Sequence, residues 1–365
     1  MHPIARIYDA DGRLTAEIAP PRSVHAVSRL GALSAECRLE LLPEDARIPV
    51  SHHDHLVVSL AGETLFDGPV VELRTDSLGR LLSLRGALVP ERDWNERVTG
   101  RYQENNVGAI LAGVIEGLSF SPVRYTPTHE FDAPIDALTF DQYPLFYAID
   151  LLAKLAGNAL WDLDWEGALR FRPSSVAPDH VVYFDPRHHA LKVWQSDEPI
   201  RNSFTARGGI VADNEFVRSF DDPESIARYG LLPMTLFVRP VNTPSVYERL
   251  REAIVSEATR PRLNKYLDVR SGGWTVRAGD LIELRGSPLP APGQDQVFRV
   301  KAREIAWSPE KARARLWFAE GRENAASYLR YLDHEHTGLD PDWVRRRVGP
   351  FQLDFSAVDS SAQLA

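Results

Sequence analysis

Three histidines and an aspartate stand close together in Ser51-His52-His53-Asp54-His55, residue types that bind transition metals. Imidazoles this close can serve zinc or nickel if the backbone bends around the ion. In an extended strand, however, His53 and His55 share one face while His52 and Asp54 point the other way. We therefore expect a polar turn that leads into the strand LVVSL, with no metal ion and no cofactor bound.

A cluster of carboxylates surrounds an expected hairpin turn. It consists of Asp162, Asp164 and Glu166, and Trp161 and Trp165 lie beside it in the sequence. Two carboxylates beside tryptophan resemble the acid/base pair of a glycosidase. The same residue types are favoured at a hairpin turn for reasons of turn geometry alone. The chain contains no GxSxG, HExxH or P-loop motif, and no GxGxxG followed by a helix. The sequence therefore predicts a turn here, and no catalytic residue.

A basic run, Arg345–Arg347, lies near the end of the chain between Trp343 and Phe351. It could contact nucleic acid, or it could belong to an arm that docks on an acidic neighbour. The net charge of −9 favours the second interpretation. Aromatic residues and arginine dominate interface energetics. The candidate interface residues are Trp343, Arg345, Arg346, Phe351 and Phe355.

Composition limits the class of protein. The chain has 365 residues, 44% hydrophobic and 25% charged, which indicates a globular protein of two or three domains. No apolar run reaches the roughly 20 residues of a membrane-spanning helix. The N-terminus lacks the order of a secretory signal. The single cysteine, Cys37, excludes an intrachain disulfide and is expected to be a buried apolar residue. The acidic balance also argues against a protein that wraps nucleic acid.

The elements that would position these residues fall into four stretches. Ser34–Leu42 alternates between apolar and charged residues, as a half-buried strand does. Helical patterns cover Val107–Glu116 and Leu145–Ala156, and a third begins at Thr243-Pro244. We expect a β-barrel or β-sandwich over 1–95, an α+β insertion over 96–200, a second strand-rich domain with a helix over 201–335, and an extended arm over 336–365.

A weak internal repeat relates two distant segments. Both DHLVVSL, from Asp54, and DLIELRG, from Asp280, begin a short strand that is followed by a long hairpin. Phe66 precedes Leu84 by the interval that separates Phe298 from Leu316. Any two β-hairpins share alternation and turns, so the repeat needs independent support. If it is genuine, residues 54–90 and 280–320 are equivalent pieces of two separate barrels.

The order of motifs resembles the baseplate hub (tail hub) proteins of long-tailed bacteriophages and related contractile injection machines. The resemblance covers most of residues 1–332, and no counterpart is evident after about 335. Each motif is a strand, turn or helix pattern, so their combination and order carry the resemblance. The matching pieces are GETLFDGPVVEL, FDQYPLFYAIDLLAKLAGNALWDLDWEGALRF, RNSFTARGG, DDPESIARYGLLP, GWTVRAGDLIELRG and QVFRVKAREIAWSPEKARARLWFAEG.

The resemblance implies a mainly β fold with an α+β insertion and two tail-tube-like β-barrel domains in one chain. It implies a homotrimer whose six barrels form a ring around a channel. Such a ring joins a six-fold tail tube or distal tail protein above to a three-fold spike or tail tip below, with a channel through which DNA could pass transiently. The expected location is the virion tail, assembled in the host cytoplasm, and the expected role is non-enzymatic.

Two other functions stay open at this point. A β-sandwich module that recognises host polysaccharide would be a monomer with exposed tryptophan or tyrosine clustered on a single barrel. A tail-associated cell-wall hydrolase would require a defined acid/base or zinc constellation.

Overall fold

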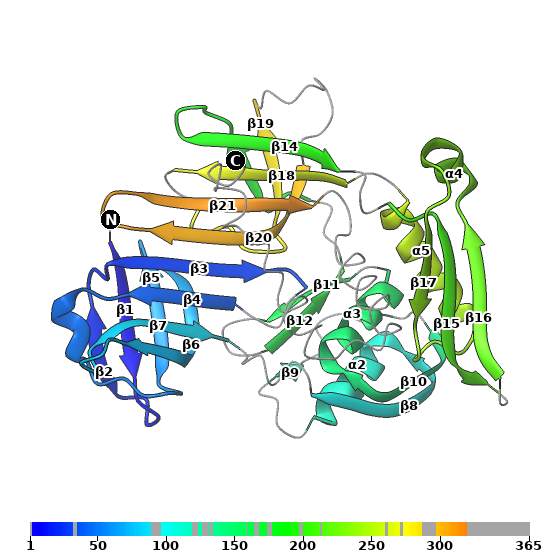
Figure 1. Ribbon diagram of the computed structural model, residues 1–365, viewed down its shortest axis with the longest axis horizontal. Helices are drawn as coiled ribbons and strands as arrows, with labels where there is room; N and C mark the ends of the chain where they lie inside the picture. Colours follow the sequence, from blue (N-terminus) through cyan, green and yellow to red (C-terminus); the bar gives the residue numbers. More distant parts are fainter. Residues whose placement is uncertain are drawn as a thin grey trace.

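The computed structural model describes residues 2–31, 35–88, 96–118, 123–125, 131, 134–157, 159–163, 168–173, 177–196, 200–211, 214–259, 262–270, 273–286 and 297–319. The protein is mainly β and has three parts (Figure 1). The first β unit is residues 2–88, and the second β unit is residues 177–196 and 262–319. The α+β unit is residues 96–173 and 200–259. The predicted mainly β fold with an α+β insertion is confirmed.

The first β unit is built from alternating strands. In β4 the side chains of Ala35, Cys37 and Leu39 are buried while their neighbours face outward, as the sequence predicts. Burial raises the pKa of the Cys37 thiol, in keeping with its expected role as a buried apolar residue. The elements are β1 (Pro3–Tyr8), β2 (Leu14–Ile18), β3 (Ser23–Arg29), β4 (Ala35–Glu40), the 3-10 helix η1 (Pro43–Arg47), β5 (His55–Leu60), β6 (Glu63–Thr75) and β7 (Leu81–Ala87).

The second β unit repeats this plan. Its strands are β13 (His180–Tyr183), β14 (His189–Ser196), β18 (Arg262–Val269), β19 (Leu281–Arg285), β20 (Val297–Trp307) and β21 (Ala312–Ala319). They are hydrogen bonded in the order β14-β18-β21-β20-β19-β13, and the first unit has the order β3-β4-β7-β6-β5-β1. Corresponding strands also follow one another in the same order along the chain. One pair differs, because β13 runs parallel to β19 whereas β1 runs antiparallel to β5.

The two units share one sheet of 13 strands, because β3 pairs with β20. Ala302 lies opposite Arg29 and Trp307 lies opposite Val24 in this antiparallel junction. Figure 1 shows the ladder β14-β18-β21-β20-β3-β4-β7-β6 running through both units. The expectation of two separate barrels is therefore wrong in one respect: the repeat exists, but its copies are joined edge to edge. Each strand covers an edge that the other would leave open.

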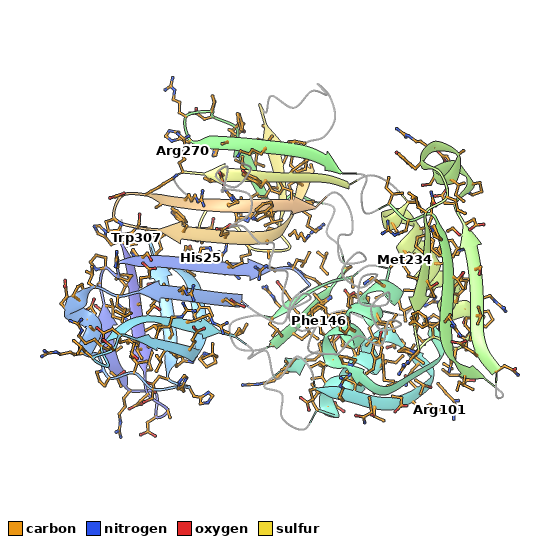
Figure 2. All side chains as sticks on the ribbon, in the orientation of Figure 1. His25, Arg101, Phe146, Met234, Arg270 and Trp307 are labelled. Carbon is orange, nitrogen blue, oxygen red and sulfur yellow. The ribbon has the colours of Figure 1, made fainter. Side chains whose placement is uncertain are left out.

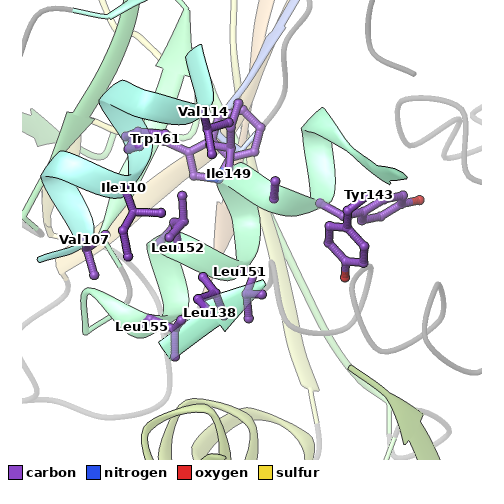
Figure 3. Close-up of a cluster of buried hydrophobic side chains, with 14 of the residues drawn as sticks. Val107, Ile110, Val114, Leu138, Tyr143, Ile149, Leu151, Leu152, Leu155 and Trp161 are labelled. Carbon is purple, nitrogen blue, oxygen red and sulfur yellow. The ribbon is translucent and has the colours of Figure 1, made fainter. Parts of the chain in front are cut away.

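The described residues form two large hydrophobic cores. One lies in the β units, and the α+β unit encloses the other. Trp161 and Phe171 of the β11–β12 hairpin are fully buried opposite each other. Figure 3 shows Trp161 among side chains of α2 and α3. The elements are β8 (Arg97–Asn106), α2 (Val107–Glu116), β9 (Arg124–Tyr125), β10 (Pro134–Pro144), α3 (Leu145–Leu155), β11 (Leu160–Leu163), β12 (Ala168–Arg172), β15 (Ser203–Val211), β16 (Asn214–Asp221), α4 (Pro223–Tyr229), β17 (Pro233–Phe237) and α5 (Pro244–Ala258).

Local signals set the helix starts. The Asn106 side chain accepts a hydrogen bond from the backbone N–H of Ala109 at 2.8 Å, which caps α2. Asp222 caps α4 in the same way through the N–H of Ser225 at 3.0 Å. Proline at the first turn of α5 follows Thr243, again as the sequence indicates. The sequence also predicts a helix near Asn324–Leu332, and these residues lie outside the described ranges.

The domain boundaries differ from those expected. Strands β13 and β14 fall within the stretch assigned to the insertion, yet they pair with β19 and β18 of the second β unit. Residues 203–258, assigned to the second barrel, instead contribute Phe204, Leu236 and Tyr247 to the core of the α+β unit. Strand pattern predicts that a segment is a strand, but the sheet it joins depends on distant partners.

Candidate assembly interface

The histidine cluster forms the turn that the sequence predicts. The backbone N–H of Ser51 donates to the carboxylate of Asp54 at 2.8 Å, and His53 has a left-handed φ of 74°. The ring of His55 pairs with the carboxylate of Asp67 on the adjacent strand β6. Nowhere in the described part of the chain do three or more His, Cys, Asp or Glu side chains gather as a metal site would need.

The second β unit contains the same turn before β19. The N–H of Arg277 donates to the carboxylate of Asp280 at 2.7 Å, as Ser51 does to Asp54. Gly279, with φ 93°, takes the left-handed position that His53 occupies in the first unit. Asp280 also contacts the ring of His180 at 2.9 Å. The aspartates that open both copies of the repeat therefore have one structural role.

Backbone pairing extends the equivalence into the long strands. The N–H of Val70 donates to the carbonyl of Asp54 at 2.8 Å, and the N–H of Val300 donates to that of Asp280 at the same distance. The ladder with the next strand shifts register directly after Val70 in β6 and directly after Val300 in β20. A β-bulge therefore stands at the same place in β6 and in β20. Before it β6 pairs with β5 and β20 with β19, and after it β6 pairs with β7 and β20 with β21.

The phenylalanines of the repeat are not equivalent, which corrects one detail of the sequence comparison. Phe298 lies opposite Ile282, two residues after the turn aspartate, and the residue in that place in the first unit is Gly68 rather than Phe66. In the first unit the Phe66 ring packs over Gly68 and Gly86. In the second unit Phe298 and Phe318 occupy those two places and stack with ring centres 5.1 Å apart. Both units thus fill the same volume with different residues.

The junction between the units includes one ion pair. His25 on β3 and Glu304 on β20 are 3.0 Å apart, and the Glu304 side chain is 10% exposed. Burial acts to raise the pKa of Glu304, but the hydrogen bond and charge of His25 bring that pKa below its ordinary value. Figure 2 labels His25 and, at the end of β20, Trp307, which lies opposite Val24. The junction is a hydrogen-bonded ladder with a charge pair across it.

The carboxylate cluster at the β11–β12 hairpin is an ion pair as far as it is described. Asp162 is buried and receives two hydrogen bonds from the Arg170 guanidinium, one of them 2.8 Å from Nε to Oδ1. Burial raises the pKa of Asp162, and the charge of Arg170 opposes that effect. Asp164 and Glu166 lie outside the described residues. The carboxylate of Asp162 is therefore engaged by a guanidinium, and the charge of Asp280 adds to the rise in its pKa.

The predicted interface residues cannot be placed. Trp343, Arg345, Arg346, Phe351 and Phe355 lie outside the described residues, as does the whole arm 336–365. None of the helices in the described ranges has the length and apolar character needed to cross a membrane. The surfaces that the structure does describe, and that sequence reasoning missed, are the open edges of the ladder. They could be found only once the strand order was known.

Comparisons with known proteins give structural likeness without sequence likeness. No family model matches the chain, and neither does any curated protein. Among solved structures, the 43 kDa tail protein of prophage MuSo2 from Shewanella oneidensis is similar, with 13% identity and a TM-score of 0.63. It covers 89% of this chain and 100% of that one. The tail protein from Neisseria meningitidis MC58 has 12% identity and a TM-score of 0.62, over 89% of this chain and 99% of that one.

A third structure extends the match. Prophage tail protein gp18 from Listeria monocytogenes EGD-e has 12% identity and a TM-score of 0.53, over 93% of this chain and 100% of that one. Identities this low show the fold alone, but each match spans a whole tail protein. The resemblance that the sequence motifs carry is confirmed in the fold: this chain has the fold of prophage tail proteins.

Proposed function

We propose that the protein is the structural hub of a phage-type tail and has no enzymatic activity. Three copies form a ring that joins the six-fold tail tube, or a distal tail protein, to a three-fold spike or tip. The ring lines the channel through which DNA passes, and it belongs to the virion tail, assembled in the host cytoplasm.

One observation carries this proposal: two β units with the same strand order lie in one chain and pair edge to edge through β3 and β20. A chain with two equivalent units has six of them in a trimer. Such a ring meets six-fold symmetry with its repeated units and three-fold symmetry with its chains. The shared fold with prophage tail proteins supports the same role.

The candidate catalytic groups support a non-enzymatic role. The carboxylate of Asp162 is bound by the Arg170 guanidinium, and that of Asp54 accepts a hydrogen bond from the backbone N–H of Ser51. General acid/base chemistry needs a group free to exchange a proton with substrate. These contacts give Asp162 and Asp54 roles in folding.

The mass of the purified full-length chain tests the proposal. Light scattering over a range of protein concentrations should give three times the chain mass, at least at the highest concentration. A mass that stays at one chain throughout, together with saturable binding to host polysaccharide, would contradict the hub and support the carbohydrate-binding module instead.

A further inference from the structure

We propose that copies join by strand addition, with β14 of one copy pairing with the C-terminal half of β6 in the next. The partner is a second copy of this chain, and the contact repeats the register of the β3–β20 junction. This inference rests on the proposed ring and names the surface that closes it.

Strand β14 offers the first edge. It ends the 13-strand ladder, with β18 on one side and no partner among the described residues on the other (Figure 1). The N–H of Arg270 donates to the carbonyl of His188 at 2.9 Å, in the register that pairs β14 with β18. Hydrogen-bonding groups of alternate residues point to opposite sides of a strand. Those of Leu191 and Val193 therefore point away from β18, whereas the N–H of His189 on that side donates to the carbonyl of Asp185 at 2.7 Å.

Strand β6 offers the second edge. Its first half pairs with β5, whereas Glu72–Thr75 pairs with β7 and has no partner on the other side within the described ranges. The N–H of Asp76 donates to the carbonyl of Arg80 at 3.0 Å, which directs Asp76 toward β7. By the same alternation, the backbone groups of Leu73 and Thr75 point outward. An edge of unpaired N–H and C=O groups is a template for another strand.

The repeat supplies the register. β20 corresponds to β6, with Ile305 at the place of Thr75, and β3 corresponds to β14, with Ala26 at the place of Val193. Ile305 lies opposite Ala26 in the junction inside the chain. Thr75 of one copy should therefore lie opposite Val193 of the next, both with outward-pointing backbone groups as an antiparallel hydrogen-bonded pair requires.

Side chains on the two edges are suited to this contact. Val193 is 39% exposed, whereas Ala26, its counterpart in the closed junction, is 4% exposed. Leu78, at the tip of the hairpin after β6, is 76% exposed. In the transferred register Asp76 lies opposite Lys192, and within its own hairpin the Asp76 carboxylate is paired with the Arg80 guanidinium at 2.7 Å. An added copy would bury apolar side chains that one chain alone leaves in water.

The contact uses two different edges, one from each copy. Each chain has one of each, so the contact is heterologous and propagates around a ring until it closes. The β3–β20 junction inside each chain and the β14–β6 junction between chains would then alternate. The sheet would continue through every copy, and neither β14 nor the C-terminal half of β6 would remain an open edge.

Cysteine cross-linking of the full chain tests the proposal. In Thr75→Cys/Val193→Cys, a short bis-maleimide should join copies into covalent dimers and then into a final species of ring size, with no larger product. Each single variant should give no such series, because neither position meets itself. Mixing the two single variants should give dimers only. Cys37 is fully buried and stays in all variants.

A matched control uses the other end of the ladder. Strand β2 is the opposite terminal strand, and Thr15 on it is exposed. Thr15→Cys/Val193→Cys should not form the series. If this control cross-links and the Thr75 pair does not, β14 meets a different edge and the proposal is wrong.

Light scattering and cross-linking together separate the strand pairing from the ring. A chain that has trimer mass by light scattering but gives no Thr75–Val193 product forms a ring through another surface. That outcome overturns the strand pairing and leaves the hub intact. A chain that stays a monomer and gives no product contradicts both.

Discussion

At the scale of single residues, the two β units conserve roles rather than identities. Asp54 and Asp280 close the same turn, and this equivalence was visible in the sequence because turn geometry needs a particular side chain. The core is different, since Phe66 over two glycines replaces the stacked pair Phe298 and Phe318. Cores accept exchanges that keep volume, so a letter-by-letter comparison loses register there. The match of Phe66 with Phe298 failed for this reason.

The tight packing at Gly86 leads to a stability prediction. A β-carbon at Gly86 would overlap the buried Phe66 ring. Gly86→Ala should therefore lower the free energy of unfolding by about 1–3 kcal/mol. Ser83→Ala, on the same strand, is the control and should change it by less than about 0.5 kcal/mol. Denaturant unfolding measures both, and equal stability of the two variants would show that the ring can move aside at little cost.

The ion pair at the junction leads to a pH prediction. The pKa of Glu304 is lowered in the folded protein from an ordinary value of 4.5. A lowered pKa contributes stability above the ordinary value, which is lost as the pH falls through the folded value. Between pH 6 and pH 3 the wild type should lose more free energy of unfolding than Glu304→Gln does. Glu310→Gln, an exposed control, should keep the wild-type loss. Parallel pH profiles for wild type and Glu304→Gln would remove the role of this pair.

At the scale of elements, local signals predicted what each segment is, and distant pairing decided where it goes. The starts of α2 and α5 were predicted because a cap and a proline act within a few residues. Strands β13 and β14 were assigned to the wrong unit, since their partners β19 and β18 lie about 70 to 100 residues further on. The open edges of the candidate interface were beyond prediction for the same reason.

The orientation of β14 leads to a paired proline prediction. Val193 directs its N–H outward, whereas Lys192 directs its N–H to β18. Val193→Pro should keep the thermal transition of the single chain and prevent ring formation. Lys192→Pro removes a hydrogen bond of the ladder and should lower the transition itself. Thermal unfolding and light scattering on both variants test this. A Val193→Pro protein that assembles normally would mean that β14 is not a contact strand.

The C-terminal arm leads to a deletion prediction from the sequence alone. Its aromatic residues, among them Trp343 and Phe351, are expected to dock on a neighbouring subunit or on the next protein of the tail. Removal of residues 338–365 should leave the thermal transition of the β units unchanged and weaken ring formation or tip attachment. Truncated protein that assembles into complete, injection-competent particles at normal yield would contradict this role.

At the scale of the whole molecule, a duplicated β unit explains the organisation of the chain. The insertion separates the two units in sequence, and β3 and β20 bring them back together in one sheet. The sequence predicted the duplication and the order of motifs, but it could not predict that the copies share a sheet. The proposed junction between chains takes its register from this junction inside the chain.

Electron cryomicroscopy of the assembled full-length protein would reveal how the copies are arranged. We expect a closed three-fold ring with six similar β units around a channel, in which β14 of each copy pairs with β6 of the next. A two-fold dimer, a monomer, or a ring whose β units face outward with the channel lined by the α+β unit would contradict it.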